Sequence, residues 1–136
     1  MVQHLEAAAR RGVDVKVVLP KTNDMKIVQD ASRFLYPQLL RAGIKVFEYH
    51  GKVMAHDKVA TFDGQVATIG SSNLDARSLR NNDEANIWAN STQVAAHLDA
   101  TLFGSDLKVS DVVKGSQRGL VNKVKDFFAW KLSALL

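Results

Sequence analysis

Residues 55–85 read AHDKVATFDGQVATIGSSNLDARSLRNNDEA, and the rest of the chain can be arranged around this stretch. Two runs rich in β-branched residues, KVATF and QVATI, flank the pair Asp63-Gly64. An Asp-Gly pair between two such runs is a strong short-range signal for a tight β-hairpin. We therefore expect residues 65–69 to fold back along the first strand and to bring residues 70–73 beside residues 56–58.

The start of this hairpin carries residues suited to binding an anion. His56 and Lys58 are two apart, so on an extended chain their side chains project side by side. Gly70 permits a positive φ or the close approach of a ligand to the backbone, and Ser71 and Asn73 supply hydroxyl and amide donors. These residues predict a small cup of donors with one positive charge, which suits an oxyanion such as a phosphodiester.

Composition limits the class of protein. The chain has 136 residues, of which 46% are hydrophobic, enough for one domain with a core. No run approaches the roughly 20 apolar residues of a membrane span, and the first residues are too polar for a signal peptide. The sequence contains no cysteine, which excludes disulfides and thiolate sites and fits a cytoplasmic protein.

The net charge of +4 is unevenly distributed. Lys and Arg outnumber Asp and Glu by eight to five in residues 1–50 and by six to two in residues 107–136, but are outnumbered four to seven in residues 51–106. An enzyme that acts on nucleic acid usually surrounds its site with basic residues. The acidic middle of this chain therefore favours another substrate.

Helical and extended patterns alternate outside the hairpin. Apolar residues recur at helical spacing in residues 2–11 and 27–40, a near-continuous β-branched run fills residues 13–19, and residues 44–49 are expected to form the next strand. We expect Pro37 to kink or divide the second helix. Strand, helix and strand at this spacing imply a right-handed crossover and an α/β architecture.

The chain after the hairpin continues the same architecture. Residues 85–89 read as a strand with Glu84 at its entrance, and Ser91 is placed to cap a helix that runs to Phe103. We expect an α/β fold with a mixed, largely parallel sheet flanked by helices, in which the hairpin joins the same sheet. The whole chain, residues 1–136, is predicted to be a single domain.

The last segment, residues 117–136, is predicted to form an amphipathic helix. One face carries apolar residues, and Asn122, Asp126 and Ser133 lie opposite, while Lys131 falls within the apolar stripe. This face can pack on its own domain or a partner, or lie on an anionic bilayer. The apolar residues are Leu120, Val121, Val124, Phe128, Leu132 and Leu135, and the neighbouring basic residues are Lys108, Lys114, Arg118, Lys123 and Lys125.

The pattern HDKVATFDGQVATIGSSNLDARS, with Asn82 and Glu84 downstream, resembles the His-Lys-Asp signature of the phospholipase D superfamily. The phrase GSSNLDARS is most similar to the bacterial cardiolipin synthase branch, and the resemblance extends loosely over nearly the whole chain. Only one signature is present where most of the family carry two, and Asp83 stands where an apolar residue is more usual. The chain therefore resembles one phospholipase D-like half, closest to the C-terminal half of such proteins.

The resemblance implies a mechanism and roles for the site residues. His56 would attack phosphorus to form a phosphohistidine, while a histidine from a second motif protonates the leaving alcohol. Glu84 would hold the far nitrogen of the imidazole and Asp63 would orient the motif. The oxygens of the phosphoryl group would be bound by Lys58, Ser71 and Asn73.

The second motif has to come from outside this chain's own signature, because His4 and His97 have no lysine two residues on, and His50, although followed by Lys52, lies in the loop before the motif. A homodimer partner or an N-terminal half outside this chain would supply it. No metal and no cofactor are needed by the implied chemistry. A metal site formed by His56, Asp57 and Asp63 is not expected, because alternation turns Asp57 away from His56.

Three functions are compatible with the sequence. The first is a phosphatidyltransferase or phospholipase D of the cardiolipin synthase type that acts on phospholipid, in the cytoplasm and peripheral to the inner membrane. The second is a dimeric, metal-independent endonuclease or nucleic-acid phosphodiesterase. The third is an inactive half-domain that pairs with another chain. The acidic middle, the GSSNLDARS phrase and the basic amphipathic end favour the first.

Overall fold

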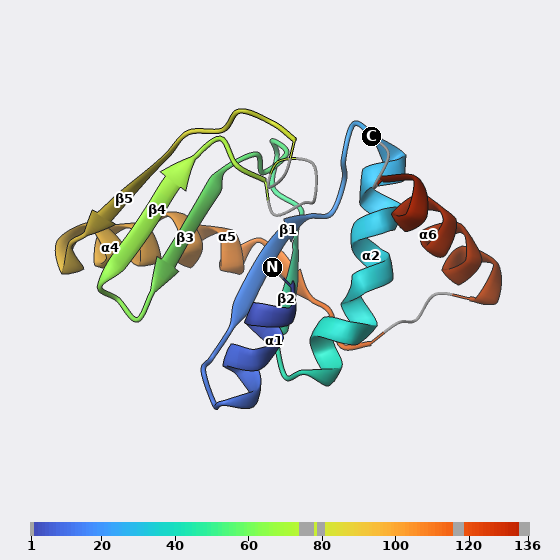
Figure 1. The fold of residues 1–136 in the computed structure, drawn as a ribbon, viewed down its shortest axis with the longest axis horizontal. Helices are drawn as coiled ribbons and strands as arrows, with labels where there is room; N and C mark the ends of the chain where they lie inside the picture. The colour runs from blue at the N-terminus through green and yellow to red at the C-terminus, as the bar shows by residue number, and fades with distance from the viewer. Residues whose placement is uncertain (1, 74–77, 79–80, 116–118, 134–136) are drawn as a thin grey trace. The chain divides into compact units, whose positions relative to one another are not determined.

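The computed structural model of the chain describes residues 2–73, 78, 81–115 and 119–133 (Figure 1). The chain divides into two compact units, one made of residues 1–55 and 110–136 and the other of residues 56–109. Each unit contains one three-stranded sheet. The second unit is thus inserted in sequence between the two parts of the first. That the whole chain acts as a single catalytic domain stays a prediction.

The first unit is a small sheet packed with helices. Its strands are β1 (Lys16–Pro20), β2 (Lys45–Tyr49) and β6 (Ser110–Val112), with β2 parallel to β1 and antiparallel to β6. Its helices are α1 (Val2–Arg10), α2 (Lys26–Arg41) and α6 (Leu120–Ser133), and α2 and α6 pack side by side (Figure 1). The core contains Tyr36, Leu39, Ile44 and Val46.

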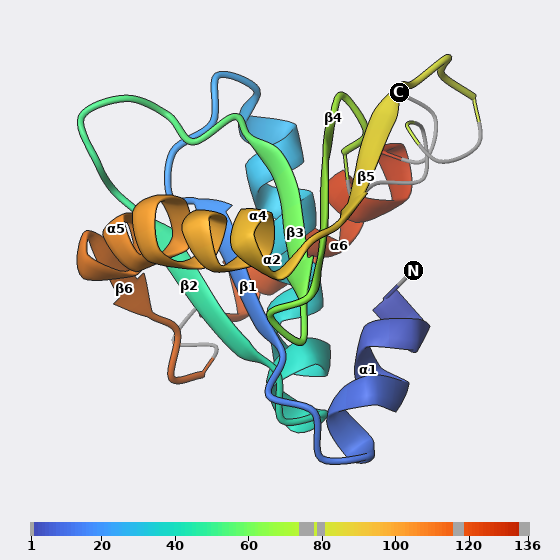
Figure 2. The same cartoon turned by 90° about the vertical axis from the view of Figure 1, so that its left-hand side faces the viewer.

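The second unit begins at the predicted histidine and contains the predicted hairpin. Strands β3 (Lys58–Phe62), β4 (Val66–Gly70) and β5 (Asn86–Asn90) pair antiparallel in this order and lie side by side in Figure 2. They are followed by α4 (Thr92–Leu98), a π-helical segment η1 (Asp99–Phe103) and α5 (Gly104–Lys108). Ser91 caps α4 as predicted, because its hydroxyl accepts a hydrogen bond from the Val94 amide at 3.3 Å.

The expected α/β class with a mixed sheet and flanking helices is confirmed, but the prediction of one largely parallel sheet needs correction. The hairpin belongs to a separate, antiparallel sheet, and the parallel pairing among the described strands is confined to β1 and β2. The reason is local. Strands β3 and β4 are joined by a tight turn, which allows only antiparallel pairing, whereas the crossover helix α2 joins β1 to β2.

Pro37 does not divide α2, which runs from Lys26 to Arg41 as one helix. A proline inside a helix costs about 3 kcal/mol because it removes a hydrogen bond and crowds the preceding turn. Tyr36 and Leu39, on both sides of Pro37, are buried in the core of the first unit. Their burial offsets the cost and keeps the helix continuous.

The sequence left open which surface the apolar stripe of the final helix meets. Asp126, predicted to lie opposite the stripe, is buried, whereas Val124, Phe128 and Leu132 of the stripe are exposed. The contact with α2 is made instead by Phe127 and Trp130, whose ring centroids lie 5.6 and 5.2 Å from that of Phe34. Residues 117, 118 and 134–136 of the predicted helix, Arg118 and Leu135 among them, lie outside the described residues.

Candidate active site

The Asp-Gly turn closes the hairpin as the sequence predicted. Asp63 and Gly64 have φ angles of 53° and 63°, and the Gln65 amide donates to the carbonyl of Phe62 at 2.9 Å. Positive φ at both central positions matches the right-handed twist of the flanking strands, and Asp and Gly tolerate it. The turn fixes the register in which Lys58 lies opposite Gly70.

At the open end of the hairpin, Lys58 contacts His56. The Lys58 Nζ atom lies 2.9 Å from Nδ1 and 3.0 Å from Nε2 of His56, and it donates to the main-chain oxygen of His56 at 2.7 Å. Lysine has only donors, so a hydrogen bond from it to the ring requires a nitrogen with a free lone pair. A lone pair on a ring nitrogen is also what attack on phosphorus requires.

Glu84 lies in a cradle of neutral donors. Its Oε2 accepts from the Ser71 hydroxyl at 2.5 Å. Its Oε1 accepts from the Ser78 hydroxyl at 2.7 Å and from the side-chain amide of Asn82 at 3.2 Å. These hydrogen bonds, led by that from Ser71, hold the pKa of Glu84 below its ordinary value, and the positive charge of Lys58 adds to the effect. The carboxylate is therefore kept ionised beside the ammonium of Lys58.

Strand β5 lies close beside the end of β4 at Gly70. The Ser71 amide donates to the carbonyl of Ala85 at 3.0 Å, and the Ala85 amide donates back to the Ser71 hydroxyl at 3.1 Å. A Cβ at Gly70 would overlap with the carbonyl oxygen of Ala85 and the side-chain amide of Asn86. Gly70 does not have a positive φ, so its role here is to admit the neighbouring strand.

These elements agree with the comparison to known proteins. Residues 1–105 match the family model described as "Cardiolipin synthase, PLD-like domain". The chain belongs to this family, the cardiolipin synthase type of phospholipase D-like domain. It is 36% identical over 135 residues to a probable cardiolipin synthase of Bacillus subtilis and 40% identical over 135 residues to a cardiolipin synthase of a Geobacillus strain.

In both relatives the match covers 97% of this chain but only 27% and 26% of the relative, so the chain spans about a quarter of the length of the curated relatives that it matches. Among solved structures, the phospholipase D family member Nuc from Salmonella typhimurium matches with a TM-score of 0.69 and 22% identity. That match covers 84% of this chain and 73% of Nuc. At this identity the likeness shows the fold, which is that of the phospholipase D family.

In this phospholipase D-like domain, the predicted site residues fall into two groups. Lys58 lies opposite Gly70, and Gly70 lies opposite Asn86. The register therefore brings His56, Lys58, Ser71 and Glu84 to the same end of the three strands. Asn73 is exposed and follows Ser71 closely in the chain. Asp63 is at the other end of the hairpin, about 17 Å of extended chain from Lys58. The geometry gives Asp63 a role in the turn and does not bring it to His56.

Two predicted roles involve contacts that differ from those seen. Among the described residues, Glu84 is bonded to Ser71, Ser78 and Asn82 and not to His56. The single hydroxyl proton of Ser71 is donated to Glu84. For Glu84 to orient the imidazole, or for Ser71 to bind a phosphoryl oxygen, this hydrogen bond has to be exchanged. Both roles stay predictions.

Sequence reasoning missed two residues of this site. Ser78, which is buried, donates to Glu84, and Asn86 accepts at Oδ1 from the Ser72 amide at 3.3 Å. Asn86 could have been found, because it lies two residues after Glu84 on an extended segment and so on the same side. Ser78 carried no periodic signal that linked it to Glu84.

The hydrogen-bond donors around Glu84 predict how its protonation affects the stability of the second unit. Because its folded-state pKa is lower than its unfolded-state value, the ionised form stabilises the second unit above the ordinary pKa of 4.5, and this contribution is lost as the pH falls from there through the folded-state pKa. Ser78→Ala removes one donor and is expected to raise the pKa of Glu84 toward 4.5, measured by carboxyl-carbon NMR. Ser72→Ala is the matched control, and an unchanged pKa in Ser78→Ala would contradict the assignment.

Proposed function

We propose that this domain transfers or hydrolyses phosphodiesters through a phosphohistidine at His56 and that its substrate is a phospholipid, as in a cardiolipin synthase-type phosphatidyltransferase or phospholipase D. The observation that carries the proposal is the contact of the Lys58 ammonium with both ring nitrogens of His56. A nucleophilic nitrogen and a cation for the phosphoryl oxygens then occupy one spot. Membership of the family supports the same chemistry.

The reaction follows from the chemistry of these groups. The lone pair of one His56 nitrogen forms a bond to phosphorus, the bond from phosphorus to the leaving alcohol breaks, and a second histidine gives its proton to that oxygen. Water or an acceptor alcohol then gives a proton to the second histidine and forms the new P–O bond, while the N–P bond breaks. Lys58, Ser71 and Asn73 bind the phosphoryl oxygens, and Glu84 stabilises the charged ring.

The second histidine comes from another copy of the motif. In our proposal, either a second copy of this chain or another segment of a longer protein provides it. A two-fold dimer would place two identical hairpins face to face, which gives one nucleophile and one acid at a shared site. The greater length of the relatives is compatible with a second motif in the same protein.

The proposed place of action is an anionic membrane surface on the cytoplasmic side, with the domain bound peripherally. The basic excess of residues 107–136 supports this placement. None of the helices in the described ranges is both long and apolar enough to cross a membrane.

Activity on vesicles of phosphatidylglycerol tests the function. Formation of cardiolipin, or release of phosphatidic acid in water, is expected from the full chain and is measured by chromatography of the extracted lipid. A nicking assay on plasmid DNA in EDTA is run in parallel. DNA cleavage without any turnover of lipid would replace the proposal with the endonuclease, and no turnover of either substrate by a stable dimer would indicate a pairing domain.

A further inference from the structure

Helix α6 has a second apolar face, which is about half exposed. Val124, Phe128 and Leu132 recur every four residues and are 47%, 58% and 49% exposed. The helix is already held on α2 by Phe127 and Trp130 on another side. The exposed stripe is therefore not needed for this packing, although exposing it to water is unfavourable.

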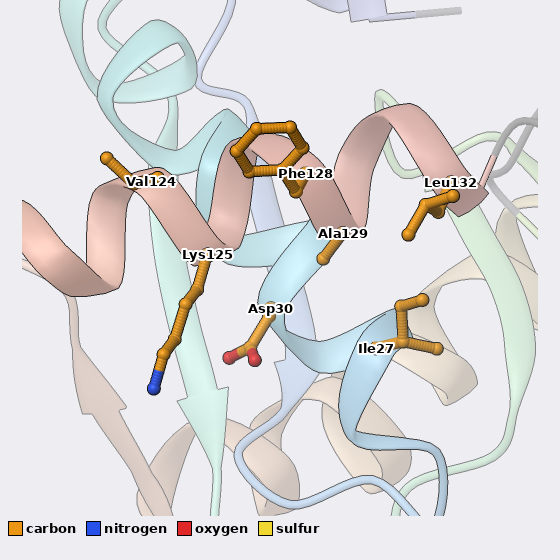
Figure 3. Close-up of a pocket in the computed structure, with 7 residues that line it drawn as sticks. All are labelled: Ile27, Asp30, Val124, Lys125, Phe128, Ala129 and Leu132. Carbon is orange, nitrogen blue, oxygen red and sulfur yellow. The ribbon is translucent and has the colours of Figure 1, made fainter.

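A groove continues the stripe onto α2. The groove has a volume of about 370 Å³, and Figure 3 shows the stripe residues along one wall, with Ile27 and Asp30 of α2 facing them. Lys125 lies next to Asp30 in this view, at one end of the groove. Apart from these two charged residues the lining is apolar, since it is completed by Ala129 and the stripe.

The charges around the stripe are of one sign on α6. With about 3.6 residues per turn, Lys125 and Lys131 lie on either side of the stripe. Lys123 is a third exposed cation of this helix. The one acidic residue of α6, Asp126, is only 3% exposed and points away from this face. The exposed surface of the helix is thus an apolar stripe with lysines at its edges.

We propose that the stripe Val124, Phe128 and Leu132, together with the α2–α6 groove, is the surface by which this domain lies on an anionic lipid bilayer. The inference rests on the proposed function, because it names the surface that brings the site to phospholipid. An apolar face enters the boundary between headgroups and acyl chains, and lysines at its edges reach the anionic headgroups. Each such lysine contributes a sequence-independent attraction.

Charge argues against a second copy of the chain as the occupant. A two-fold contact through this face would place the same surface against itself. The Lys125 and Lys131 side chains of both copies would then be gathered in one contact, whereas an anionic bilayer is complementary to them. Lys131 also lies over the ring of Phe127, 5.8 Å from its centroid, which keeps its charge at the edge of the stripe.

Vesicle cosedimentation tests the proposal. The full chain is expected to bind vesicles that contain phosphatidylglycerol more tightly than vesicles of phosphatidylcholine alone, with weaker binding at high salt. Phe128→Ser is expected to lower the partition constant about tenfold or more, and Lys125→Gln about fivefold. The matched controls, Val53→Ser and Lys52→Gln, change exposed residues elsewhere in the same unit and are expected to bind as the original chain.

Other outcomes separate this inference from the proposed function. Equal binding to both vesicle types, or equal vesicle binding by Phe128→Ser and Val53→Ser, would contradict the proposal that the stripe is the lipid-binding surface. Phe128→Ser that instead converts a dimer to a monomer in sedimentation, with unchanged vesicle binding, would assign the stripe to a protein contact. His56→Ala should bind vesicles normally. If the full chain turns over detergent-dispersed lipid but does not bind vesicles, the proposed lipid surface is wrong and the proposed function is retained. If it binds vesicles but does not turn over lipid, the proposed function is wrong and the lipid surface is retained.

Discussion

His56→Ala is expected to reduce phosphatidyl transfer by about three orders of magnitude or more, the size of effect seen when a catalytic nucleophile is removed. His56 is exposed at the start of β3, so truncation leaves no cavity and the fold is expected to persist. The contact of its ring with Lys58 at 2.9 Å is lost, and with it the nitrogen that would bond to phosphorus. Turnover of labelled phospholipid and the amount of acid-labile phosphoenzyme are measured together.

His97→Ala is the matched control for this variant, because His97 is an exposed histidine on α4 of the same unit. It is expected to keep both activity and phosphoenzyme formation. A phosphoenzyme that survives in His56→Ala but disappears in His97→Ala would refute the assigned nucleophile. Circular dichroism of each variant separates loss of chemistry from loss of fold.

Gly70→Ala is expected to destabilise the second unit by about 3 kcal/mol, at the upper end of what overpacking costs. The added methyl would overlap with the carbonyl of Ala85, which is backbone and cannot rotate away, and with the side chain of Asn86. Strands β4 and β5 would have to separate at the point where Ser71 and Ala85 exchange hydrogen bonds. The free energy of unfolding is measured by urea titration.

Gly119→Ala provides the control, since a Cβ at Gly119 meets nothing within 4 Å and its φ is not positive. It is expected to change stability by less than about 1 kcal/mol. Equal stability of Gly70→Ala and the original chain would show that β5 does not approach β4 as described. Restoration of part of the loss by Asn86→Ala in the Gly70→Ala background would show which contact is responsible.

The parts of the site that depend on local sequence could be predicted. The turn at Asp63 and Gly64 follows from backbone preferences of two residues, and the turn in turn sets the register of β3 and β4. The proximity of His56 and Lys58 follows from the two-residue period of an extended chain. Each of these inferences involves neighbours in sequence, for which the geometry is nearly fixed.

The parts of the fold and the site that depend on contacts between distant residues could not be predicted. The Ser78 hydroxyl donates to Glu84 from six residues earlier in the chain, and no periodic pattern encodes that contact. Strand β6 pairs with β2 over only three residues, too few for a pattern. Which side of α6 packs on α2 was left open by the sequence, because the helix offers two apolar sides, and the stacking of Trp130 on Phe34 selects between them.

The insertion of the second unit within the first also bears on how the protein folds during synthesis. Residues 56–109 form one unbroken segment, so all the partners needed for β3, β4 and β5 have been synthesised before β6 and α6. The first sheet, by contrast, has to wait for Val112 to reach Phe47 across the whole inserted segment. A ribosome stalled on a chain in which residues 56–109 have emerged but β6 has not would therefore carry the hairpin of β3 and β4 formed and the first sheet still lacking an edge strand.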